Sequence, residues 1–144
     1  MSRIVYLDTN ILVDYIEPSR ANHNDAKQII GYCLMQRNAL LTSCDIMTTI
    51  YYINAKRNRR DALDNIKRIN QFVDIIEFSN KEIAKTCQLM REDRRYVDLE
   101  DTLQYILAQK GQCDIIISND RGFISKEIEL LSSEAFIEKY IVNA

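Results

Sequence analysis

The sequence predicts an α/β fold, a three-layer α/β/α sandwich with a mostly parallel central sheet of four to five strands. Short apolar runs that fit buried strands alternate along the chain with longer segments of helical periodicity. One run, residues 113–118, is apolar and β-branched, as expected of a strand buried on both faces. The chain of 144 residues fits a single domain, 1–144.

The first half of the chain is expected to hold two strands and four helices. The expected ranges are 3–7 for the first strand, a helix from there to about 16, a helix over 22–37, a strand over 40–42, a helix that begins at 43 or 45, and a helix over 60–72. Pro18 ends the first helix, and Ser43 or Asp45 is able to cap the third. That helix carries an apolar stripe predicted to face inward, formed by Ile46, Ile50 and Ile53.

The second half continues the alternation. The expected ranges are 74–78 for a strand, 80–91 and 98–111 for two helices, 113–118 and 128–131 for two strands, and 134–142 for a closing helix. Ser79 or Asn80 caps the first of these helices, and Asp98 caps the second. Gly111 fits the C-terminal stop of that second helix.

Composition excludes several classes of protein. The apolar share of 47% and the charged share of 28% are typical of a soluble globular protein, and no apolar run approaches the roughly 18 residues of a membrane span. Arg3 and Asp8 bracket an apolar stretch that is too short for an export signal. We therefore expect a cytoplasmic protein without a membrane partner.

Several catalytic and binding motifs are missing. The cysteines show no Cys-x-x-Cys pairing, which disfavours zinc and disulfide frameworks, and all are expected to be buried thiols: Cys33, Cys44, Cys87 and Cys113. His23 is the only histidine and lies at a helix start, where a surface role is favoured over catalysis. The 3 glycines form no phosphate-binding loop.

Carboxylates follow two predicted strands and begin a helix. Asp8 follows the strand over 3–7 and Asp120 follows the strand over 113–118, so both emerge at one edge of the sheet if these strands are parallel neighbours. Asp98 and Asp101 lie three residues apart in the first turn of a helix, although a capping role alone explains Asp98 well. Separate carboxylates that meet at one edge suit a hard divalent cation, Mg²⁺ or Mn²⁺.

The net charge of -2 hides an asymmetry. Residues 54–70 hold six basic against two acidic residues, whereas residues 96–144 hold four basic against nine acidic residues. A basic segment beside an acidic end suits a polyanion guided toward a metal site, and the predicted RNA-binding residues are Lys56, Arg57, Arg59 and Arg60. The alternative for this segment is a solvated helix face.

Motifs spread over the whole length resemble the PIN-domain ribonucleases, in particular the small toxins of VapBC-type toxin–antitoxin pairs. These motifs are Leu-Asp-Thr-Asn at 7–10, Thr-Ser at 42–43, Asp-Leu-Glu-Asp-Thr-Leu-Gln at 98–104, Ile-Ile-Ile-Ser-Asn-Asp at 115–120, and Phe123. The resemblance implies a PIN-like fold and a Mg²⁺- or Mn²⁺-dependent endoribonuclease. Asp8, Asp101 and Asp120 match three of the family's acidic positions. The resemblance also implies an antitoxin partner and a homodimer.

Two positions depart from the family pattern. The family's second acidic position, a glutamate in the third helix, falls on Thr49, and a hydroxyl cannot supply its charge. Asp45 lies four residues earlier on the same helical face and is a candidate substitute, although it also suits a helix cap. A further aspartate common before the final phenylalanine is here Gly122. A site with three acids binds metal more weakly than one with four or five.

In the implied chemistry, Asp8 and Asp101 hold the cation, and Asp120 completes its shell or orients the attacking water. Residues beside these acids, expected to support them or contact phosphate, are Thr9, Asn10, Thr49, Asp98, Ser118 and Asn119. Ordinary loop and capping roles explain each of them equally well.

Two other functions stay open. A PIN fold with a weakened site would act by binding RNA or protein. A phosphoaspartyl protein would also begin with a strand-end aspartate. Haloacid-dehalogenase phosphatases need Asp-x-Asp, however, and position 10 is asparagine. Receiver domains need a second acid beside the first and a downstream lysine, and neither stands out.

Overall fold

The computed structural model describes residues 2–143, which form five strands and eight helical segments. The strands are β1 Ile4–Leu7, β2 Ala39–Ser43, β3 Asp74–Ile76, β4 Ile115–Ile117 and β5 Glu129–Leu131. The helices are α1 Thr9–Ile16, α2 His23–Met35, α3 Ile46–Ala55, α4 Arg59–Phe72, α5 Asn80–Glu92, α6 Leu99–Lys110 and α7 Ser133–Phe136, which continues into the π-helical turn η1 Ile137–Val142.

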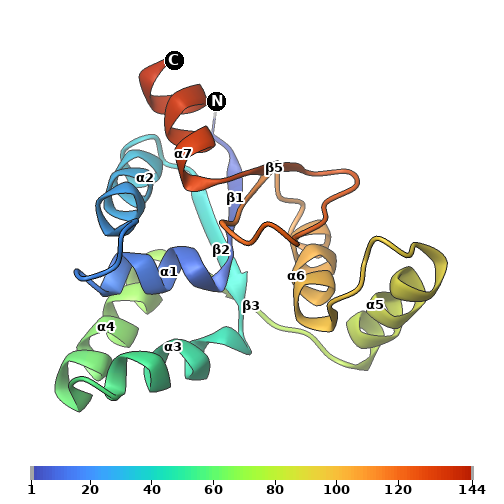
Figure 1. The fold of residues 1–144 in the computed structure, drawn as a ribbon, viewed down its shortest axis with the longest axis horizontal. Coiled ribbons are helices and arrows are strands. Elements are labelled where there is room, and N and C mark those ends of the chain that lie inside the picture. The colour runs from blue at the N-terminus through green and yellow to red at the C-terminus, as the bar shows by residue number, and fades with distance from the viewer. Residues whose placement is uncertain (1, 144) are drawn as a thin grey trace.

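The strands form one sheet in the order β3-β2-β1-β4-β5, and every pair in it is parallel. Figure 1 shows α1 and α2 on one side of this sheet and α5 and α6 on the other. Parallel neighbours need crossover connections, and the helices provide them. The predicted α/β sandwich with a parallel-centred sheet is confirmed, and the sheet is parallel throughout.

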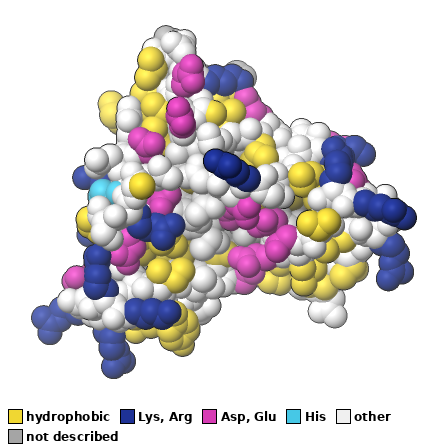
Figure 2. Space-filling model, in the orientation of Figure 1, with side chains coloured by type: hydrophobic (Ala, Val, Ile, Leu, Met, Phe, Trp, Pro, Cys, Tyr) yellow, Lys and Arg dark blue, Asp and Glu magenta, His cyan; other side chains and the backbone are white. Residues whose placement is uncertain are grey.

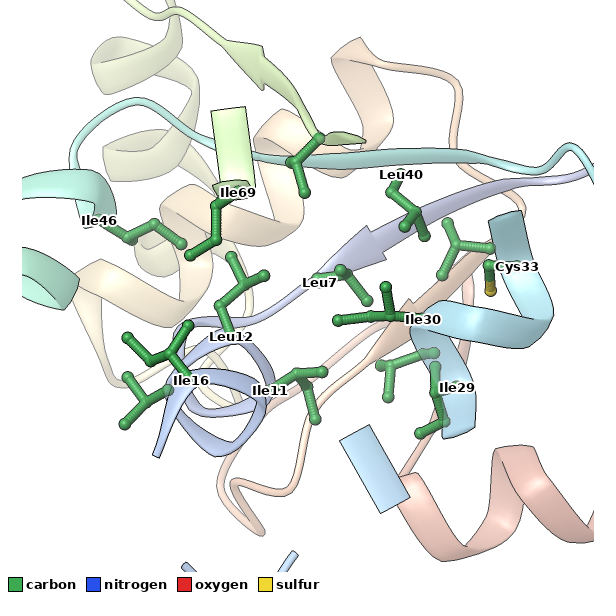
Figure 3. Packing of buried hydrophobic residues seen from close by; sticks show 14 of the residues in the cluster. Leu7, Ile11, Leu12, Ile16, Ile29, Ile30, Cys33, Leu40, Ile46 and Ile69 are labelled. Atoms are coloured by element: carbon green, nitrogen blue, oxygen red, sulfur yellow. The ribbon is translucent and has the colours of Figure 1, made fainter. Parts of the chain in front are cut away.

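The sheet divides the core into two clusters because successive side chains of a strand point to opposite faces. Val5 and Leu7 pack with α1 and α2, whereas Tyr6 packs with α6 on the other face. Figure 3 shows the first cluster, in which Leu7 lies among side chains of α1 and α2 such as Leu12 and Ile30. Strands buried on both faces are the reason that these segments read as continuous apolar runs.

The order of the strands creates a crevice at the carboxyl ends of β1 and β4. From β1 the chain winds outward through β2 to β3, and it then returns to the other side of β1 to form β4 and β5. Open α/β sheets bind ligands at such a reversal. Figure 2 shows acidic side chains gathered here, in the middle of the face shown, between the positions of α1 and α6 in Figure 1.

Some expectations about single residues were wrong. Ile46 and Ile50 are buried as predicted, but Ile53 is 40% exposed, because the buried face of α3 continues to Asn54, which is 2% exposed, and Ile53 lies beside that face. Cys33 and Cys113 are buried, whereas the thiols of two other cysteines are exposed, Cys44 and Cys87. Both of these lie outside the apolar stripes that face the core.

Gly111 ends α6 as predicted, but for a different reason. Its φ is -78°, which any residue adopts, and the left-handed position is the next residue, Gln112, with φ 54°. A Cβ at position 111 would lie 2.5 Å from Cδ2 of Leu41. Any larger residue at position 111 would therefore have to displace the Leu41 side chain of β2.

No helix among residues 2–143 is long and apolar enough to cross a membrane.

The burial of α3 predicts different costs for two isoleucines on it. Ile50→Ala should lower the free energy of unfolding by about 2–5 kcal/mol, because it leaves a cavity at a fully buried position. The same change at Ile53 should cost less than about 0.5 kcal/mol. Urea unfolding followed by circular dichroism measures both, and equal costs would contradict this orientation of α3.

Candidate active site

Asp8 is the most enclosed carboxylate at the crevice, with 4% of its surface exposed. It caps α1 and accepts a hydrogen bond from the backbone N–H of Thr9 at 2.7 Å. The side chains of Asn10 and Ser118 donate to its Oδ2 at 3.2 and 2.5 Å. Burial raises the pKa of Asp8, and the hydrogen bonds from Ser118 and Thr9 oppose that shift.

Ser118 links the ends of β1 and β4. Leu7 pairs with Ile117 in the sheet, which places Asp8 and Ser118 side by side. The Ser118 hydroxyl donates to Asp8 and accepts from the backbone N–H of Asp120 at 3.1 Å. The Asp120 carboxylate in turn accepts from the N–H of Gly122 at 2.8 Å and is exposed to solvent. One buried hydroxyl thus fixes the loop that carries Asp120 relative to Asp8.

Asn119 points away from the acids. Its amide donates to Oγ of Ser133 at 2.9 Å and accepts from the N–H of Ser133 at 2.8 Å, which joins the loop to the start of α7. Its own N–H donates to Oδ1 of Asn10 at 3.3 Å. Asn119 therefore supports the loop with its side-chain oxygen and one of the two N–H donors of its amide.

Asp98 and Asp101 have different roles at the start of α6. The Asp98 carboxylate caps the helix by accepting from the N–H of Asp101 at 2.9 Å. The Asp101 carboxyl faces the crevice, and its pKa is raised to about 7, first by burial and then by the nearby negative charge of Asp120. The Asp101 and Asp120 carboxylates are therefore near enough to influence each other's protonation.

The negative charge of this patch has no compensating cation in the protein. Among residues 2–143, none of the site carboxylates takes part in an ion pair: Asp8, Asp98, Glu100, Asp101 and Asp120. Burial raises the pKa of Glu100, and the charges of Asp45 and Asp8 raise it further. Like charges held together without a partner destabilise one another, so this arrangement favours a bound cation.

The donor set fits a hard divalent cation. Thr9 Oγ1 is buried beside Asp8 and is the one such side-chain atom among the described residues that lacks a hydrogen-bond partner. Oxygen ligands of this kind, carboxylates with a hydroxyl nearby, are those that Mg²⁺ and Mn²⁺ prefer. In residues 2–143 no three acidic, histidine or cysteine side chains already converge into a coordination group. The carboxylates would have to close further around an ion.

Thr49 lies on the side of the crevice formed by α3. It is exposed and lines a shallow depression of about 260 Å³ together with Asp45 and Glu100. Asp45 does not cap α3, since its carboxylate accepts a hydrogen bond from Oγ of Ser43, the last residue of β2. On the α3 side of the crevice, the acidic side chain therefore comes from Asp45, the residue before α3.

The basic segment lies at the far end of α3 from Asp45. α3 has 10 residues and is therefore about 15 Å long. Lys56, Arg59 and Arg60 are exposed at the turn between α3 and α4. Arg57 is bound to the carboxylate of Glu17 at 3.1 Å. Arg57 is therefore less available to RNA than the prediction assumed.

Two residues that support Asp8 were not found by sequence reasoning. Gln104 of α6 donates a hydrogen bond to Asp8, and it accepts one from the hydroxyl of Tyr6 at 3.3 Å. Both are buried in the second core cluster or beside it. The three-residue spacing of Gln104 from Asp101, on one face of α6, was the available signal.

Comparison with known proteins gives consistent results. The sequence model of the PIN domain family matches residues 4–122. Ribonuclease VapC1 of Aquifex aeolicus (strain VF5) is 42% identical over 139 residues, which cover 96% of this chain and 96% of that protein.

Two solved structures share the fold at low sequence identity. The Mycobacterium tuberculosis toxin VapC20, described as cleaving the sarcin-ricin loop, has a TM-score of 0.65 at 18% identity over 83% of this chain and 92% of its own. A chain of a toxin–antitoxin complex from Klebsiella pneumoniae has a TM-score of 0.68 at 18% identity over 90% of this chain and 97% of its own.

The raised pKa of Asp101 predicts how stability depends on pH without divalent ions. A carboxyl that binds its proton more tightly when folded stabilises fully below its unfolded pKa, and that contribution is lost as pH rises through the folded pKa. The free energy of unfolding should therefore fall between the ordinary value of 3.8 and about 7. Asp101→Asn should flatten this dependence of the unfolding free energy on pH. Asp120→Asn should shift the midpoint of the dependence to lower pH, because it removes a negative charge beside Asp101. Urea unfolding in chelator measures it, and an unchanged slope in Asp101→Asn would contradict the assignment.

Proposed function

The chain belongs to the PIN domain family, and on that premise we propose that it is a divalent-metal-dependent endoribonuclease, the toxin of a toxin–antitoxin pair. The observation that carries the proposal is the uncompensated patch around the buried Asp8 at the reversal of the strand order. The ribonuclease from Aquifex aeolicus supports RNA as the substrate. Family membership leaves the phosphoaspartyl alternative without support.

In the proposed mechanism, Asp8 and Asp101 hold a Mg²⁺ or Mn²⁺ ion. When bound, the ion supplies an activated water and offsets charge on the phosphate oxygens. Asp120 would orient the attacking water, because its carboxylate lies near Asp101 and is exposed to solvent. Hydrogen bonds fix the orientation of the Asp8 carboxylate, so it need not reorient during turnover; the donors are Ser118, Asn10 and Gln104.

The partners follow from the same proposal. We infer a small antitoxin protein that blocks the crevice, since the structural neighbour from Klebsiella pneumoniae is a toxin–antitoxin complex. A homodimer and a cytoplasmic location belong to the proposal as family expectations. The second candidate function is a weakened nuclease that mainly binds RNA or protein. The absence of an acid at Thr49 favours it, and cleavage assays decide between the two.

Asp8→Asn tests the catalytic assignment. It should lower RNA cleavage in Mg²⁺ or Mn²⁺ at least about 100-fold, since loss of even the partner of a metal ligand costs about 10–100-fold. Thermal melting shows that the variant is folded, and isothermal titration calorimetry should show weaker Mn²⁺ binding. Asp74→Asn is the matched control, because Asp74 is exposed in the edge strand β3, which β2 separates from β1. Equal activity of the two variants would reject the proposal.

Thr49→Glu tests whether the missing acid limits the site. Position 49 shares its depression with Asp45 and Glu100, so an added carboxylate should tighten Mn²⁺ binding and raise cleavage. Asp45→Asn should do the opposite if Asp45 substitutes for the family glutamate. If Asp45→Asn weakens Mn²⁺ binding while Thr49→Glu changes nothing, Asp45 already fills the fourth acidic position.

A further inference from the structure

A polar cavity lies at the opposite end of α1 from Asp8. Its volume is about 390 Å³, within the range of small-ligand pockets. The last turn of α1, the start of α2 and one face of α4 line it. The lining side chains that carry the argument are Tyr15, His23, Lys27, Asp61, Asp64 and Arg68.

Buried hydrogen bonds hold the wall of this cavity in place. The carboxylate of Glu17 accepts from the Asn54 amide at 2.5 Å, and Asn54 accepts from the Asn65 amide at 2.7 Å. Asn54 and Glu17 are 2% and 8% exposed. Arg57 is bound to Glu17 from outside at 3.1 Å. The ring of Tyr15 packs against Phe72 with the ring centroids 5.4 Å apart. The shape of the cavity is therefore set before any ligand enters.

The cavity offers donors and acceptors that the protein does not use. Among residues 2–143, Lys27 and Arg68 have no carboxylate within 4.0 Å, and the carboxylates of Asp61 and Asp64 have no cation within that distance. His23 uses Nδ1 with the backbone oxygen of Asp14 at 2.9 Å, which leaves Nε2 for another partner. Two cations among two carboxylates do not make a simple phosphate site. They suit a ligand that has both an anion and hydrogen-bond donors.

The cavity and the acidic patch lie on one face of the molecule. The 8 residues of α1 span about 12 Å between the Asp8 cap and the cavity wall. Figure 2 shows the histidine, in cyan, and neighbouring basic side chains on the same face as the acidic patch in the centre. This distance corresponds to about three or four stacked nucleotides of one strand at roughly 3.4 Å each.

We propose that this cavity binds one nucleotide of the single-stranded RNA whose backbone is cut at Asp8. Lys27 and Arg68 bind the phosphate, and the amino group of a base donates to Asp61 or Asp64. Single-stranded RNA is recognised in this manner, by splayed bases held by aromatic rings and read along their edges. The proposal rests on the proposed ribonuclease function and adds a distant subsite that selects RNA length and base.

A binding experiment tests the cavity without cleavage. Fluorescence anisotropy in chelator measures the Kd of a mixed single-stranded RNA of about twelve nucleotides, long enough to reach from the acids to the cavity. Arg68→Gln and Lys27→Gln should each raise the Kd about tenfold, a typical loss for one nucleotide contact. Lys67→Gln is the matched control: it removes the same charge from the neighbouring residue of α4, which does not line the cavity. Equal losses in Arg68→Gln and Lys67→Gln would overturn the proposal.

A second measurement uses single nucleotides. Titration with each of the four nucleoside monophosphates should shift the side-chain amide signal of Asn65 in the NMR spectrum, and those whose bases carry an amino group should bind more tightly than UMP. The cavity proposal is wrong if none of the four shifts this signal. If the signal does not shift but the wild-type protein cleaves RNA, only the cavity proposal is wrong and the proposed ribonuclease function stands. Absence of cleavage by wild type in Mg²⁺ and Mn²⁺ would instead overturn the proposed function.

Discussion

The cost of burying the Asp8 carboxylate governs the architecture of the crevice. A carboxylate removed from water is unstable unless hydrogen bonds replace its hydration. Three different segments supply them here: the start of α1, Ser118 after β4, and Gln104 of α6. The parallel pairing of β1 with β4 is what brings Ser118 to Asp8. The strand order and the placement of α6 are thus both tied to one charged group.

The sequence was sufficient to predict the sheet but not the environment of every side chain. Apolar runs with turn residues between them located all five strands, and the signal is strongest for β1 and β4, which are buried on both faces. Ile53 was misplaced because periodicity does not distinguish it from Asn54, the residue that continues the buried face of α3. Gly111 was assigned to a helix stop, and its close approach to the Leu41 side chain is a contact between segments distant in sequence.

The prediction of the site was limited in the same way: the sequence located the residues but not their contacts. Asp8, Asp98, Asp101 and Asp120 were identifiable because strand ends and helix starts fix their positions on the backbone. The structure confirms the predicted capping role of Asp98, whereas only the structure shows that the Asp101 carboxyl has a raised pKa beside Asp120. Gln104 and Tyr6 were not identified, because the spacing of Gln104 from Asp101 does not by itself show which buried groups its side chain contacts. Local patterns therefore find the acids, and tertiary contacts decide what each can do.

Asp45 offers a physical route by which the crevice would tolerate the missing acid at Thr49. A glutamate within α3 reaches the crevice with a long side chain, whereas Asp45 has a shorter one but stands a turn closer to the end of β2. The hydroxyl of Ser43 binds its carboxylate and orients it away from the role of helix cap. Its charge contributes to the raised pKa values of Glu100 and Tyr6, so Asp45 lies near the acidic patch. Under the proposal, Asp45 would compensate for the missing acid at Thr49, because the field at the crevice depends on the summed nearby charge and not on which residue carries it.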